Sequence, residues 1–148
     1  MSQTKTLAAY GAALRYEDIP SDVLNRAKNL TLQTLGVSLG ALGSDVGRRA
    51  VELGRIMGGG SSEATIWGEG SKVSAAAAGL ANGTLADALD WEDCSWTGHP
   101  SACARVHRLC RGRTAPRFRQ GLSACLITAY ELYERIAMAV QAGPDSAG

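Results

Sequence analysis

The chain has 148 residues, a formal net charge of +1 and four cysteines. This length corresponds to one domain or part of one, and it is sufficient to bury a core. The near-neutral charge argues against nucleic acid as a partner. No apolar run reaches the roughly 18 residues that a membrane span needs. Because neither a secretory signal nor a disulfide-framework spacing is evident, we expect a cytoplasmic protein without membrane contact.

Apolar residues that recur every three or four positions predict four amphipathic helices, over residues 6–14, 21–42, 45–57 and 122–140. The third of these is expected to turn four side chains inward: Val46, Ala50, Leu53 and Met57. An alanine-rich helix is expected over residues 73–86, where the small residues Ala77, Gly79, Ala81 and Gly83 would let another helix approach closely. The glycine-bounded segment 63–67 predicts a brief strand or extended link. The predicted fold class is all-α and bundle-like.

An acidic stretch follows the alanine-rich helix. It places four acids beside two indole rings and a histidine: Asp87, Asp90, Glu92, Asp93, Trp91, Trp96 and His99. A carboxylate packed against indole rings and other carboxylates is poorly solvated, which suits a general acid or base near neutral pH. His99 adds an imidazole, a side-chain group that commonly serves as a general acid or base. Carboxylate and imidazole together can remove a proton beside a carboxyl group and protonate a leaving hydroxyl.

A simpler interpretation of the same stretch stays open. Acid clusters are most often solvated helix ends and loops, and composition alone favours that interpretation here. The choice between the two depends on the surrounding sequence.

Several blocks of the chain, in order, resemble the MmgE/PrpD family of 2-methylcitrate dehydratases and cis-aconitate decarboxylases. The resemblance covers nearly all of residues 5–103 and again 121–140. Its blocks are Arg26-Ala27-Lys28, Thr34-Leu35-Gly36-Val37, Glu63-Ala64-Thr65-Ile66-Trp67-Gly68, Ala81-Asn82-Gly83, Ala88-Leu89-Asp90-Trp91-Glu92-Asp93, His99-Pro100-Ser101-Ala102 and Ala129-Tyr130-Glu131-Leu132 to Arg135-Ile136.

The resemblance implies that residues 1–148 form the N-terminal part of a larger helical domain, accompanied in the family by an α/β domain. It implies a hydro-lyase that needs no metal or organic cofactor, acts on a small tricarboxylate such as 2-methylcitrate and forms a homodimer. A related decarboxylase or epimerase of small di- and tricarboxylates is the alternative. An inactive truncated remnant is a further one, and little activity is expected from the chain alone.

By position, Asp90 matches the family's active-site aspartate and is the candidate for proton transfer. His99 matches an active-site histidine that assists it. Cys94 falls where relatives carry a substrate-contacting hydroxyl, and a thiol is a weaker hydrogen-bond donor. Trp91 and Ser101 are the other candidate substrate contacts. Two further positions are read as structural: Asn82, and Gln33 where an aspartate is common in the family.

Segment 104–120 departs from the family pattern, which has an apolar helix there. It carries six arginines and Pro116, and an unpaired buried arginine is costly. A local reading-frame change that reverts before Gly121 is one hypothesis for it. Binding of nucleic acid through these arginines is a weaker alternative, because no recognition motif surrounds them. Residues 141–148 are expected to form a frayed tail.

A metal site is the remaining alternative. His99, Cys103, His107 and Cys110 follow one another at steps of four, four and three residues, which would place them along one helix face. They would spread over about 16 Å of helix axis at 1.5 Å per residue, so they cannot close a tetrahedron around zinc. We therefore expect no metal.

Overall fold

The computed structural model describes residues 2–100 and 118–141, which form five α-helices, one short 3₁₀ helix and a two-stranded hairpin. The helices are α1 (Gln3–Ala13), α2 (Ser21–Ala41), α3 (Asp45–Gly58), α4 (Ala75–Asp87) and α6 (Phe118–Gln141). The 3₁₀ helix η1 spans Tyr16–Asp18, and the strands are β1 (Ala64–Thr65) and β2 (Lys72–Val73). The predicted all-α class is confirmed.

Three of these helices begin where the sequence offers a serine. The hydroxyl oxygens of Ser2, Ser44 and Ser74 accept backbone N–H bonds in the first turns of α1, α3 and α4. Such caps satisfy N–H groups that the helix itself cannot pair. Local sequence therefore fixes the starts of α3 and α4, the helices that carry the core.

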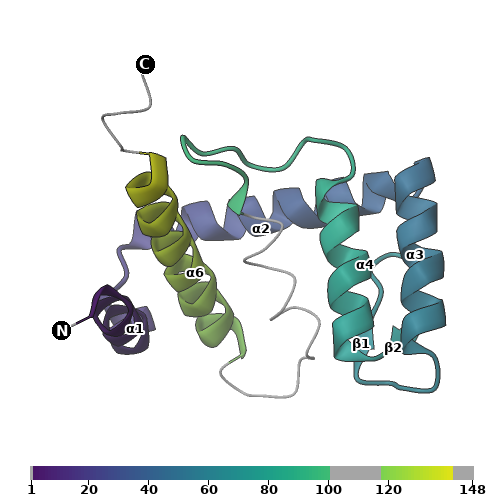
Figure 1. Cartoon of the computed structure of the whole chain (residues 1–148), viewed down its shortest axis with the longest axis horizontal. Helices are drawn as coiled ribbons and strands as arrows, with labels where there is room; N and C mark the ends of the chain where they lie inside the picture. Colours follow the sequence, from purple (N-terminus) through teal and green to yellow (C-terminus); the bar gives the residue numbers. More distant parts are fainter. Residues whose placement is uncertain (1, 101–117, 142–148) are drawn as a thin grey trace.

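The long helix α2 spans the molecule and links two groups of elements (Figure 1). Near its C-terminal end lie α3, α4 and the hairpin, whereas α1 and α6 lie toward its N-terminal end. The core lies in the first group and consists of Ala41, Val51, Ala64, Ile66, Val73, Ala77, Ala78, Ala81 and Leu85. The loop that follows α4 is thus attached to a packed helix pair.

Helices α3 and α4 approach each other through small residues, as predicted for Ala77 and Ala81, whereas a Cβ at Gly79 would meet nothing within 4 Å, so the prediction is wrong there. A Cβ atom at Gly54 would lie 2.9 Å from the Cβ of Ala81, and one at Gly58 would lie 2.6 Å from the Cβ of Ala77. Carbon atoms need about 3.5–4.0 Å, so only glycine fits at this contact. The small residues of both helices therefore set the spacing of the pair.

The predicted inward face of α3 is wrong except at Ala50. Val46, Leu53 and Met57 are 52%, 46% and 61% exposed. The helix instead buries Gly47, Ala50, Val51, Gly54 and Gly58. The glycine face of α3 packs against α4 because the two helices approach closely there. The larger apolar side chains therefore lie on the exposed side of the helix. In the helix predicted over 122–140, Leu126 is buried, whereas the apolar side chains of Ile136 and Val140 are exposed.

Asn82 joins α4 to the hairpin and is fully buried. Its side chain accepts a hydrogen bond from the Trp67 N–H at 2.9 Å and donates one to the Thr65 carbonyl at 3.0 Å. The strands pair antiparallel, with Ala64 opposite Val73. The structural role predicted for Asn82 is confirmed, as is a short strand inside segment 63–67.

In the ranges 2–100 and 118–141, no helix has both the length and the apolar character needed to cross a membrane. The arginine-rich segment 104–120 and the tail 141–148 lie outside the described side chains, so the hypotheses about them are not tested.

Candidate functional site

The acidic stretch forms a loop that begins at the C-terminal end of α4. The Asp90 N–H donates to the Asp87 carbonyl at 3.2 Å, and Asp90 itself takes the left-handed conformation with φ 54°. Aspartate tolerates this region better than most residues, although it remains uncommon outside glycine. The chain therefore turns sharply at Asp90, where the helix has just ended.

A tight turn then folds the loop back on itself. The Ser95 N–H donates to the Gly98 carbonyl at 2.8 Å, and the Ser95 hydroxyl donates to the same oxygen at 3.0 Å. Gly98 has φ 142°, and a Cβ there would collide with the hydroxyl of Tyr133. Only glycine suits this position. As a result His99 returns toward Glu92.

Two helices hold the loop in place. From α6, the Tyr130 hydroxyl donates to the Asp93 carboxylate, and Glu134 accepts from the Thr97 hydroxyl at 2.6 Å. From α2, the Gln33 side-chain amide donates to the Trp91 carbonyl at 3.0 Å. Gln33, read from the sequence as a packing position, therefore holds the backbone between two acids.

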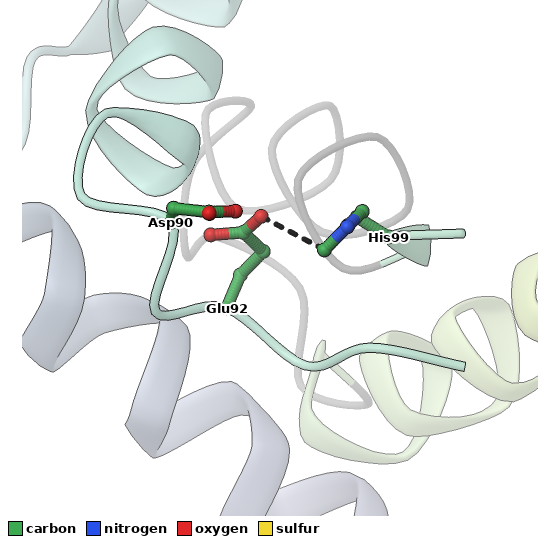
Figure 2. A group of neighbouring side chains, drawn as sticks. All are labelled: Asp90, Glu92 and His99. Atoms are coloured by element: carbon green, nitrogen blue, oxygen red, sulfur yellow. Dashed lines mark ion pairs between the residues drawn. The ribbon is translucent and has the colours of Figure 1, made fainter. Parts of the chain in front are cut away.

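Asp90, Glu92 and His99 come together inside this loop (Figure 2). One carboxylate oxygen of each acid and one ring nitrogen of the histidine lie within 4.8 Å of one another. Glu92 Oε1 and His99 Nδ1 lie 3.0 Å apart. Asp90 and His99, which the sequence predicts for one site, are brought together in the structure.

Burial differs sharply among the three side chains. The Glu92 side chain is 1% exposed and that of His99 is 45% exposed, while Asp90 is exposed. The second oxygen of Glu92, Oε2, is buried and has no hydrogen-bond partner in the described part of the chain. The poorly solvated carboxylate is thus Glu92, and Asp90 lies at the open side.

The indole rings do not shield this group, contrary to expectation. Trp91 is 72% exposed and Trp96 is 90% exposed. Both side chains are therefore largely in contact with solvent. The substrate contact predicted for Trp91 stays a prediction.

The other predicted contacts have separate outcomes. Cys94 is exposed, and its thiol donates to the Ser95 carbonyl at 3.3 Å, within the loop itself. Ser101 lies outside the described residues, as do Cys103, His107 and Cys110 of the metal alternative. The contacts assigned to Cys94 and Ser101 stay predictions.

The role of Glu92 was not anticipated. The sequence shows four acids in seven positions and nothing in their spacing singles out the buried one. The turn-forming residues between positions 92 and 99 were the available signal, since a tight turn there pairs residues at its two ends.

The cluster offers two chemical possibilities. Two carboxylates and an imidazole nitrogen are groups that bind divalent cations. However, Glu92 and His99 already contact each other directly. A carboxylate bound to one imidazole nitrogen leaves the other nitrogen for proton transfer, and Asp90 supplies a second proton acceptor beside it. The geometry as it stands favours proton transfer.

Comparison with protein families gives a match to the MmgE/PrpD N-terminal domain over residues 5–145. The chain belongs to the MmgE/PrpD family. The match runs through segment 104–120 and places the cluster inside the MmgE/PrpD domain. Comparison with curated proteins and with solved structures gave no match.

Proposed function

We propose that this MmgE/PrpD chain contributes the proton-transferring groups of a cofactor-independent lyase that acts, as a homodimer, on a small tricarboxylate such as 2-methylcitrate. The observation that carries the proposal is the proximity of Asp90 and His99 within 4.8 Å in a chain of this family. Dehydration needs a base and an acid that act on adjacent carbon atoms, and two side chains this close together suit that requirement.

The steps follow from the chemistry of the groups. Asp90, at the open side, takes the proton from the carbon next to a substrate carboxylate. The hydroxyl on the neighbouring carbon leaves as water once it receives a proton from the imidazolium of His99. The electron pair of the broken C–H bond forms the new double bond. Each positioned acid or base contributes a rate factor of about 10²–10⁴.

Proton removal can be tested without complete turnover, which is expected to be low for the chain alone. The chain is incubated with 2-methylcitrate in D₂O, and loss of the substrate's carbon-bound proton is followed by NMR. We expect exchange with the wild-type chain and a decrease of about 100-fold or more in Asp90→Asn, whereas His99→Gln should retain exchange because His99 acts on the leaving hydroxyl. Asp87→Asn is the matched control, because Asp87 is exposed and outside the cluster.

The outcomes separate the candidate reactions. Unchanged exchange in Asp90→Asn would contradict the proposal, as would the absence of both exchange and substrate-induced chemical shifts in the wild-type chain. Release of CO₂ from cis-aconitate would indicate the decarboxylase of the same family. Exchange without loss of water would indicate an epimerase.

A further inference from the structure

Glu92 has an environment unlike that of the other acids in the loop. Its side chain is 1% exposed, and one of its oxygens is buried with no partner in the described part of the chain. Burying a carboxylate is costly unless a charge or a hydrogen bond compensates it. The compensating group that the structure supplies is the imidazole of His99, at 3.0 Å.

We propose that Glu92 is a positioning residue for His99. Its carboxylate accepts the proton on Nδ1, and this fixes both the ring orientation and the tautomer. Nε2, on the opposite edge of the ring, is then the nitrogen without a proton in the neutral form. The role of Nε2 in proton transfer to and from the substrate rests on the proposed function.

The hydrogen bonds that fix the loop support this assignment. The turn closed by Ser95 and Gly98 brings His99 to Glu92, and the Thr97 bond to Glu134 holds the turn against α6. The imidazole is half-exposed while its acidic partner is buried, so the partner is behind the ring as seen from solvent. A carboxylate behind a histidine orients that ring in many catalytic and metal sites.

Tautomer measurement by NMR tests the proposal directly. The chain is labelled with ¹⁵N-histidine, and long-range ¹H–¹⁵N correlations are recorded above the pH at which the rings become neutral. The sequence has only two histidines, so His107→Gln assigns the resonances. We expect the proton of neutral His99 on Nδ1, whereas free neutral imidazole side chains favour Nε2.

Two variants give the contrast. Glu92→Leu has similar volume but cannot accept a proton, and we expect His99 to shift toward the Nε2-protonated form. Asp90→Asn changes a nearby acid that is exposed and is not the 3.0 Å partner of Nδ1, and we expect the tautomer to be unchanged.

The results either support or overturn the proposal. Wild-type His99 protonated on Nε2 overturns it, and this measurement holds even if Glu92→Leu does not fold. Stoichiometric Mg²⁺ or Zn²⁺ binding that is lost in both variants also overturns it, because the cluster is then a cation site. The tautomer needs no turnover. A Nδ1-protonated ring in a chain without exchange activity supports Glu92 and contradicts the proposed function alone.

Discussion

The contact between α3 and α4 makes a quantitative prediction for Gly54→Ala. The new Cβ would lie 2.9 Å from the Cβ of Ala81 and 3.0 Å from Cδ1 of Ile66. Both contacts are about 0.5–1 Å too short, so the helices must separate or Ile66 must leave its rotamer. Overpacking of this kind costs about 1–3 kcal/mol. Alanine in place of glycine in a helix interior raises the free energy of unfolding by about 1 kcal/mol, which offsets part of this cost.

Gly79→Ala is the matched control because it makes the same substitution inside α4. A Cβ at Gly79 would meet nothing within 4 Å. That variant should gain about 1 kcal/mol in unfolding free energy, so the difference between the two variants isolates the packing cost at about 1–3 kcal/mol. Gly58→Ala should cost more than Gly54→Ala, since its Cβ would lie 2.6 Å from the rigidly held Cβ atoms of Ala77 and Val73.

Urea unfolding followed by circular dichroism at 222 nm measures all three variants against the wild-type chain. Equal midpoints and slopes for Gly54→Ala and Gly79→Ala would refute the reasoning, because the two substitutions would then differ in nothing that affects stability.

Three further predictions concern the elements that position the site. Asn82→Ala leaves the Thr65 carbonyl and the Trp67 N–H without this buried partner, and it should cost about 2–4 kcal/mol in urea unfolding. Gln33→Ala removes one hydrogen bond to the loop, and it should speed amide hydrogen exchange in residues 90–99 without changing exchange in α3. At Asp90, asparagine should preserve stability because it also tolerates φ 54°, whereas valine should lose about 1–2 kcal/mol.

Helix positions were predictable because apolar spacing and serine caps are local signals. The start of α3 at Asp45 follows directly from the cap at Ser44. The face of α3 was not predictable in the same way. Apolar periodicity predicts that Leu53 and Met57 are buried, because glycine does not count as an apolar side chain. In the structure Gly54 and Gly58 are buried instead, because they allow close approach to α4. The buried face thus depended on a tertiary contact.

The pairing of Asp90 with His99 came from the family resemblance, and the turn-rich sequence between them is consistent with it. The buried carboxylate of Glu92 did not emerge from either source. Which acid becomes buried depends on the left-handed turn at Asp90 and on the anchors that α2 and α6 place on the loop. Those anchors involve residues about 40–60 positions away in the sequence, and short-range patterns do not contain them.

The site therefore has a different source of stability from the core. In the loop 88–100, the fully buried side chains are those of Glu92 and Pro100, so apolar burial contributes little there. Its order depends instead on the hydrogen bonds that Gln33 and Tyr130 donate to the loop and that Glu134 accepts from it, each worth about 0.5–1.5 kcal/mol. Loss of one bond leaves the others in place, while loss of all three removes a few kcal/mol and releases the loop. We therefore expect the loop to open, and His99 to separate from Glu92, at a lower free energy than the unfolding of α3 and α4.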